Sequence, residues 1–199
     1  GVLSAKEAFA GFVDPNVLLF MGMFVIGEAF FATGVAVVVG NVVHKFAKTE
    51  TSLLVAVMMI TGILSGFLSN TGTAAVLIPV IIGICKKSGF KQTKLLMPLV
   101  FAAAMGGNIS LIGAPGNMIA QAGLQQAGLG SFNFFDYGLV GLPILIVGTI
   151  FYATIGKRFL PDAPSHQPDG AFEGNDDYSH VPSWKKWTAA IILILTVVA

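Results

Sequence analysis

Residues 52–85 form a run of 34 residues without a charged side chain, which a polar cluster, Ser69-Asn-Thr-Gly-Thr73, interrupts near its middle. As one straight helix the run would be about 51 Å long, whereas the hydrocarbon core of a membrane is about 30 Å thick. The cluster leaves two arms of roughly 16 and 12 residues, each too short to cross. We therefore predict a re-entrant helical hairpin, with its tip at membrane depth and both feet on one side.

Composition supports an all-α integral membrane protein. Hydrophobic residues make up 55% of the chain and charged residues 11%, whereas a soluble domain has about 25% charged residues. The net charge of +1 gives no reason to expect nucleic-acid binding. The single cysteine, Cys85, excludes an internal disulfide and offers no metal-ligand spacing. Because the chain lacks an initial Met and ends inside an apolar run, we interpret it as an internal fragment.

A second apolar stretch, residues 95–125, is interrupted by the glycine-rich cluster at residues 106–117. Its two arms together are long enough to cross a membrane, so we predict a broken transmembrane helix. Irregular backbone at membrane depth is tolerated only where it is buried in protein or lines a cavity. Two such interruptions in succession are the best sequence indication of a transporter's binding site.

The remaining chain is predicted from local signals. Asp14-Pro15 is a helix start, and five acidic residues and four prolines mark the surface loop. The predicted elements are a first span at residues 17–34, an amphipathic interfacial helix at 35–48, a last span at 139–156, a surface loop at 160–183, and the start of a further span at 187–199.

Basic residues fall almost entirely on one face of this layout. The hairpin and the later crossings bring ten of the 11 Lys and Arg residues to the same side, with Lys6 on the other. By the positive-inside rule that face is cytoplasmic, and the protein is a multi-pass protein of the cell (inner) membrane. The ten are Lys45, Lys48, Lys86, Lys87, Lys91, Lys94, Lys157, Arg158, Lys185 and Lys186.

The predicted hairpin tip offers ligands for both a cation and an anion. Oxygen atoms of Ser65, Ser69 and Asn70, with carbonyls that end the first arm, suit a dehydrated cation. Ser65 and Ser69 lie four residues apart, which predicts that they share one helical face. Backbone N–H groups that begin the second arm, with Asn70 and Thr71, can donate to an anion. For any single residue, capping of a helix break is the simpler interpretation.

The second cluster combines flexible backbone with polar side chains. Its candidate binding residues are Asn108, Ser110 and Asn117, although a helix kink satisfied by neighbouring groups is an equally good interpretation for each asparagine. Glu28, a carboxylate inside the first predicted span, suggests proton or cation handling. The alternative is that Glu28 pairs with a partner elsewhere.

These residues carry a resemblance to a known family. The segment Ser65-Gly-Phe-Leu-Ser-Asn-Thr-Gly-Thr-Ala-Ala75, followed by Leu111-Ile-Gly-Ala-Pro-Gly-Asn117, resembles the first-half signature of the divalent anion sodium symporters, and the similarity extends through Phe134-Phe-Asp-Tyr-Gly-Leu-Val-Gly-Leu-Pro143. One departure is Ala114-Pro115-Gly116, where that family usually has Thr or Ser followed by two prolines.

The resemblance implies the fold, the partners and the site. The chain would be one half of an inverted-repeat transporter, a homodimer in membrane lipid that moves its substrate by an elevator-like displacement. Asn70 and Thr71 would contact a substrate carboxylate or sulfate, and we add Thr73 of the same motif. One sodium ion, the implied cofactor, would be held by Ser65, Ser69, Asn70 and the backbone of Gly113.

We accordingly predict sodium-coupled symport of a small divalent anion such as a dicarboxylate or sulfate. The alternative is a related ion transporter, either a sodium/proton antiporter or an oxyanion exporter. A membrane-embedded enzyme is not expected, because the intramembrane serines have no adjacent base. Three regions are expected: residues 1–51 as a span and interfacial helix on the scaffold side, residues 52–128 as the hairpin and broken helix on the transport side, and residues 129–199 as a span, an acidic cytoplasmic loop and a further helix.

Overall fold

The computed structural model describes residues 4, 9, 11–13, 15–33, 43, 49–161 and 182–198. Within these residues every regular element is a helix and none is a strand, so the predicted all-α class is confirmed. The elements are η1 (Gly11–Val13), α2 (Pro15–Ala32), α4 (Glu50–Ser65), α5 (Asn70–Ser88), α6 (Thr93–Gly106), α7 (Pro115–Gln126), α8 (Gly138–Thr154), η2 (Gly156–Arg158) and α9 (Ser183–Val198).

A helical hairpin forms at the predicted position, with α4 and α5 as its arms. Thr49 caps the start of α4 by accepting a hydrogen bond from the Ser52 N–H at 3.1 Å. At the far end of α5, Gly89 adopts a left-handed conformation with φ of 74°, and its N–H bonds the Cys85 carbonyl at 2.9 Å. The second arm is 19 residues long rather than 12, because α5 begins at Asn70, inside the polar cluster, and continues past Cys85 to Ser88. That the hairpin re-enters a membrane stays a prediction.

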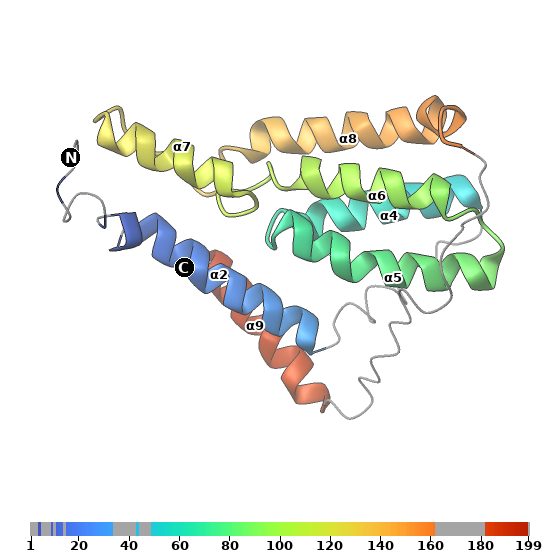
Figure 1. Ribbon diagram of the computed structural model, residues 1–199, viewed down its shortest axis with the longest axis horizontal. Helices are drawn as coiled ribbons and strands as arrows, with labels where there is room; N and C mark the ends of the chain where they lie inside the picture. The colour runs from blue at the N-terminus through green and yellow to red at the C-terminus, as the bar shows by residue number, and fades with distance from the viewer. Residues whose placement is uncertain are drawn as a thin grey trace.

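Helix α6 lies against both arms of the hairpin and against α8, as Figure 1 shows for this layer of four helices. Leu53 of α4, Leu99 of α6 and Leu145 of α8 are fully buried where these helices meet. At Gly62 and Gly106 the backbones of α4 and α6 approach each other directly, since a Cβ atom on Gly106 would overlap the backbone of Gly62. The chain between the two arms and the break in α6–α7 therefore lie close together.

The hairpin returns the chain to the end of this layer at which it began. Glu50 at the start of α4, Lys94 at the start of α6 and Lys157 after the end of α8 line one cavity. The structure thus places the basic segments around Lys94 and Lys157 at the same end of the helices, as the hairpin interpretation requires. Lys45 and Lys48, which were predicted to join them, lie outside the described residues.

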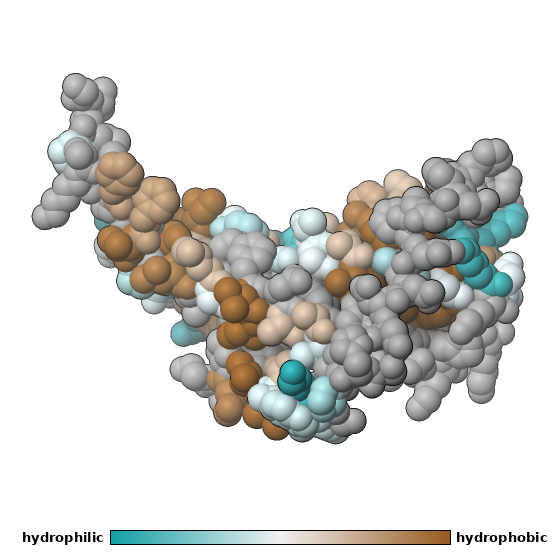
Figure 2. Space-filling view, turned by 60° about the horizontal axis from the view of Figure 1, so that its bottom comes forward, coloured by the Kyte–Doolittle hydropathy of each residue, from teal (hydrophilic) through white to brown (hydrophobic). Residues whose placement is uncertain are grey.

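Helices α2 and α9 pack side by side, away from the layer of four (Figure 1). Large apolar side chains are exposed on both, among them Met21, Val25, Trp187 and Leu195, and Figure 2 shows apolar surface gathered over this part of the molecule. Among the described residues, no helix combines the length and the hydropathy needed to cross a membrane.

Several predicted features fall outside the described part of the chain. These are Asp14 as a helix cap, the interfacial helix at residues 35–48, and the loop at residues 162–181. Helix α9 begins at Ser183, four residues before the predicted apolar run. The broken helix is described throughout: α6 ends at Gly106, α7 begins at Pro115, and the irregular backbone between them coincides with the predicted cluster.

Candidate functional site

The tip of the hairpin meets the break between α6 and α7 at the side-chain amide of Asn70. In the orientation that satisfies both ends of the amide, Nδ2 donates to the Ser65 Oγ at 2.7 Å and to the carbonyls of Ala103 and Gly113, each at 3.1 Å. The Ser65 hydroxyl in turn donates to the Ala103 carbonyl at 2.7 Å. Three oxygen atoms from three different segments thus surround one atom of Asn70.

The break itself is held by buried side chains rather than by helical hydrogen bonds. Asn117 Nδ2 donates to the carbonyls of Gly107 and Ser110, each at 2.9 Å. The Ser110 hydroxyl donates to the carbonyl of Gly66, which ties the break directly to the turn of the hairpin. Both Ser110 and Asn117 are buried. These bonds satisfy carbonyls that the end of α6 leaves without helical partners.

Tyr137, which precedes α8, supports the same region from outside. Its hydroxyl donates to the Asn117 carbonyl at 3.0 Å. Burial raises the pKa of the Tyr137 phenol, so the group stays protonated and able to donate at neutral pH. The Leu111 N–H bonds the Phe134 carbonyl at 2.9 Å, which fixes the segment before α8 against the break. The start of α8 is therefore part of the scaffold of the site.

Two glycines let the segments approach this closely. A Cβ atom on Gly107 would overlap the amide group of Asn70. A Cβ atom on Gly113 would lie 2.6 Å from the Gly107 carbonyl oxygen and 3.0 Å from that of Gly66, both too short for van der Waals contact. The glycines of the second cluster thus make room for the hairpin tip.

Four helix ends converge here, and their partial charges determine the electrostatic potential of the site. Helices α4 and α6 end at Ser65 and Gly106, and their terminal carbonyls carry partial negative charge. Helices α5 and α7 begin at Asn70 and Pro115, and their first N–H groups carry partial positive charge. A cation and an anion can therefore both be stabilised at the junction without a charged side chain.

The structure brings together three of the four residues predicted to hold sodium: Ser65, Asn70 and Gly113. The fourth, Ser69, caps α5, because its hydroxyl accepts a hydrogen bond from the Gly72 N–H at 3.1 Å. The prediction that Ser65 and Ser69 share a helical face is wrong. Helix α4 ends at Ser65, and Ser69 has extended backbone angles, so the two serines belong to different segments.

Two of the three residues predicted to contact substrate lie on one surface groove. Asn70 and Thr71 line a groove of about 350 Å³ between α5 and α6, whose other walls are apolar, among them Ile78 and Val100. The side chain of Thr73 lies in the interior instead, with an exposed fraction of 0%. Its hydroxyl has no hydrogen-bond partner among the described residues.

Of the candidates in the second cluster, Ser110 and Asn117 face inward, whereas Asn108 is exposed and donates to the Ala104 carbonyl at 3.3 Å. Sequence reasoning missed the Ala103 carbonyl, because a carbonyl inside a regular helix has no sequence signature. It also missed Gln121, a buried residue whose Oε1 accepts from the Phe132 N–H at 2.7 Å. A glutamine on an otherwise small and apolar helix face is the signal that could have found it.

Other chemistry is not gathered at this site. The side chain of Glu28 lies outside the described residues, although its backbone belongs to α2. Across the part of the chain that the structure describes, no three His, Cys, Asp or Glu side chains group in a way that could hold a metal ion. The candidate site therefore consists of hydroxyl, amide and backbone groups.

A sequence profile described as citrate transporter matches residues 1–199, the whole chain. The chain is 33% identical over 171 residues to an uncharacterized transporter of Escherichia coli, covering 85% of this chain and 28% of that protein. No solved structure gives a significant match.

Two further relatives have names that state their substrates. A sodium/sulfate cotransporter of Chlamydomonas reinhardtii is 28% identical over 168 residues, which cover 80% of this chain and 19% of that protein. A sodium-dependent dicarboxylate transporter of Staphylococcus saprophyticus is 27% identical over 177 residues, which cover 80% of this chain and 33% of that protein. The chain thus spans between a fifth and a third of the length of the curated relatives it matches. As predicted, these relatives are transporters and not enzymes.

Proposed function

The chain belongs to the citrate transporter family, and we propose that it forms part of a sodium-coupled symporter of a small divalent anion. Two of the relatives named above are sodium-coupled carriers by name. The observation that carries the proposal is the set of oxygen atoms around the Asn70 amide. A dicarboxylate or sulfate is the substrate class that fits both the relatives and a neutral, donor-rich helix end.

Sodium would occupy the position around which these oxygens gather. Ser65 Oγ and the carbonyls of Ala103 and Gly113 all point at Asn70 Nδ2. If the amide turns and withdraws from these oxygens, Oδ1 faces the space that Nδ2 leaves, and a sodium ion in that space replaces the lost hydrogen bonds. Unwound backbone and helix C-termini are the usual sodium ligands in transporters. Ser69 contributes by capping α5, and its backbone lies beside Asn70.

The substrate would bind at the groove that Asn70 and Thr71 line. The positive end of α5 and the Thr71 hydroxyl can both donate to one carboxylate or sulfate. Thr73 would meet the substrate only after the tip moves, because its hydroxyl now faces the interior. In the second cluster, we propose that Ser110 and Asn117 hold the backbone in place and that exposed Asn108 is available to a ligand.

The larger assembly follows from the same proposal. We propose that α4 and α5 form a re-entrant hairpin in the cell membrane and that a second, inverted half completes the substrate site. Residues 52–128 would belong to the moving part, whereas residues 1–51 and 129–199 would contact lipid and the partner subunit of a homodimer. The apolar surface of α2 and α9 supports their place at a lipid or protein interface.

Uptake into proteoliposomes that contain the full-length protein tests the proposal. Labelled succinate, citrate and sulfate are offered with an inward gradient of sodium or of potassium. We expect at least one dianion to accumulate with sodium only. Sodium-driven proton movement without dianion uptake, or efflux of an oxyanion, would favour the related ion transporter and would make Glu28 the first residue to substitute.

A further inference from the structure

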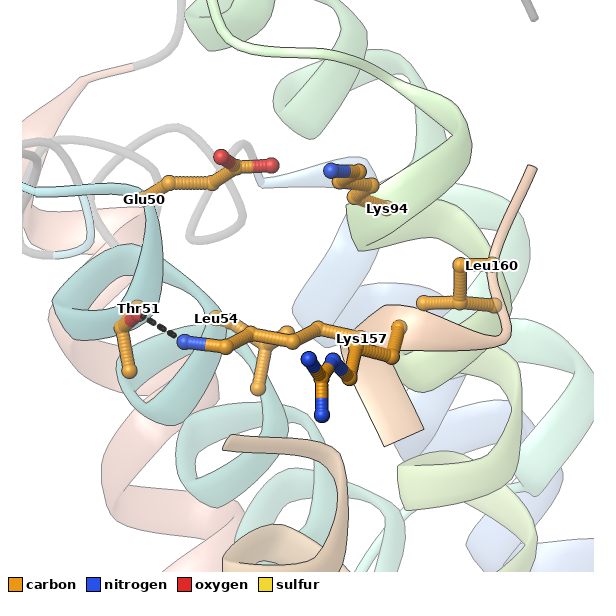
Figure 3. Close-up of a pocket in the computed structure, with 7 residues that line it drawn as sticks. Glu50, Thr51, Leu54, Lys94, Lys157 and Leu160 are labelled. Carbon is orange, nitrogen blue, oxygen red and sulfur yellow. Dashed lines mark hydrogen bonds between the residues drawn. The ribbon is translucent and has the colours of Figure 1, made fainter. Parts of the chain in front are cut away.

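A second polar cavity lies at the opposite end of the helices from the hairpin tip. Its volume is about 370 Å³, within the range of about 300 to 1,000 Å³ that small-molecule sites occupy. Three cationic side chains and one carboxylate border it: Lys94, Lys157, Arg158 and Glu50. Figure 3 shows Glu50 and Lys94 extending toward each other from facing helices, with Lys157 below them. No part of the proposed transport site lies here.

The walls of this cavity are fixed by bonds between segments that are distant in sequence. Lys157 Nζ, from η2, donates to Thr51 Oγ1 of α4 at 3.1 Å (Figure 3). Thr93 Oγ1, at the start of α6, donates to the Pro161 carbonyl at 2.9 Å. Leu54 and Leu160 form a buried apolar floor. The charged groups are thus held around a preformed space.

The charges predict a ligand with two different ends. Lys157 and Arg158 outnumber the single carboxylate of Glu50, and this pair of cations favours a phosphate group. Glu50 Oε1 is buried and accepts no hydrogen bond from any described residue. A carboxylate in the first turn of a helix is favourable because of the helix dipole, but this does not satisfy a buried oxygen. Glu50 Oε1 can therefore accept a hydrogen bond from a ligand, and a cationic donor fits a carboxylate best.

Apolar surface leads away from the cavity along α8. Phe151 in the last turn of α8, and Ile155 and Phe159 on either side of η2, expose 45%, 54% and 78% of their surface. A headgroup in the cavity could therefore continue into acyl chains that cover this face of α8. Basic pockets between the ends of membrane helices are common sites for lipid headgroups.

We propose that this cavity binds a phosphoethanolamine group, as the headgroup of an aminophospholipid. The phosphate lies between Lys157 and Arg158, and the primary ammonium pairs with Glu50. This site is independent of the transport proposal, because its test measures lipid binding and not uptake.

Binding is measured by native mass spectrometry of the full-length protein titrated with phosphatidylethanolamine or phosphatidylcholine of matched acyl chains. Both lipids carry a phosphodiester, but the choline nitrogen is fully methylated and cannot donate to Glu50. We expect phosphatidylethanolamine to bind about tenfold more tightly, as for one hydrogen bond to a charged group. Glu50→Gln should abolish that preference, and Arg158→Gln should weaken both lipids.

Lys86→Gln is the matched control, since it removes one exposed cation from the same end of the helices without lining the cavity. Its lipid affinities should stay within twofold of the unaltered protein. A melting temperature for each variant separates lost binding from lost folding. Equal binding of the two lipids, or an unchanged preference in Glu50→Gln, overturns the proposal. Soluble phosphoethanolamine that binds as tightly as the lipid would overturn the lipid assignment.

Discussion

Asn70 and Gly113 belong to different interruptions of the chain, yet the Asn70 side-chain amide nitrogen lies 3.1 Å from the Gly113 carbonyl oxygen. One residue starts the second arm of the hairpin, and the other lies in the break between α6 and α7. The two polar clusters are thus one site. Any ion or substrate that displaces the Asn70 amide acts on both clusters at once.

Ser65→Ala tests the proposed sodium ligands. The substitution removes a hydroxyl that lies against both Asn70 and the Ala103 carbonyl. We expect the sodium concentration for half-maximal uptake to rise severalfold, with a smaller change in substrate affinity at saturating sodium. The affinity for the anion changes only through its coupling to sodium binding, which is typically about 1 to 3 kcal/mol. Ser88→Ala, which removes a hydroxyl bonded to the Ile84 carbonyl at the other end of α5, should leave both values unchanged.

Thr71→Val tests the substrate contact, because Thr71 is exposed at the groove and valine is nearly isosteric. Loss of one hydrogen bond to a charged group should weaken dianion uptake by roughly ten- to 150-fold. The control is Thr61→Val, which makes the same change at a buried hydroxyl in α4 that has no partner among the described residues. Normal uptake by Thr71→Val would show that the hydroxyl only stabilises the start of α5.

Gly107→Ala tests the close approach of the hairpin tip to the break. The added methyl group would overlap the Asn70 amide, so we expect a loss of stability of about 1 to 3 kcal/mol, together with weaker sodium binding. Gly116→Ala introduces the same methyl group where nothing lies within 4 Å. Thermal unfolding in detergent compares the two variants. An equal melting temperature for both would mean that Asn70 and Gly107 are not in contact.

Asn117→Leu tests how the break is held. The change leaves the Gly107 carbonyl without its donor, at a cost of about 1 to 3 kcal/mol. It also removes the shorter of two hydrogen bonds to the Ser110 carbonyl, which keeps the Gly113 N–H at 3.4 Å. Tyr137→Phe removes one donor to the Asn117 carbonyl and should cost about 0.5 to 1.5 kcal/mol. Melting temperatures of the full-length variants rank the two effects. The opposite ranking would indicate that Tyr137 contributes more than Asn117 to the stability of the break.

A labelling experiment tests the orientation in the membrane. Single cysteines replace Lys86 or Arg158 in a Cys85→Ser background, since both side chains are exposed at the same end of the helices. Both cysteines should be shielded from an impermeant reagent added outside whole cells. Labelling of the Lys86 position alone would make α4 and α5 a full crossing and would remove the re-entrant hairpin.

The helices were predictable from the sequence where the signal is local. The uncharged arms of the hairpin, the break between α6 and α7, and the proline that begins α7 all follow from short apolar runs and helix-breaking residues. The end of α5 was not predictable in this way, because Lys86 and Lys87 end an apolar run without ending a helix. Charged residues stop a segment from entering hydrocarbon, but they are good helix formers.

The candidate site was only partly predictable. Ser65, Asn70 and Gly113 were grouped because of a family resemblance, since spacing alone cannot reveal which loops meet. The error over Ser65 and Ser69 arose because the last helical residue depends on how Gly66 packs against Ile109 and Gly106. The buried position of Thr73 likewise depends on which face of α5 meets α4.

The backbone contact between Gly62 and Gly106 limits how this part of the protein can move. With no side chain between them to repack at this crossing, α4 and α6 have few alternative positions there. The two helices would therefore travel as a single rigid body, which carries Ser65 and the Ala103 carbonyl along unchanged. A bound ion would then be released by rearrangement of the tip, where Asn70 can rotate, and not by separation of the helices.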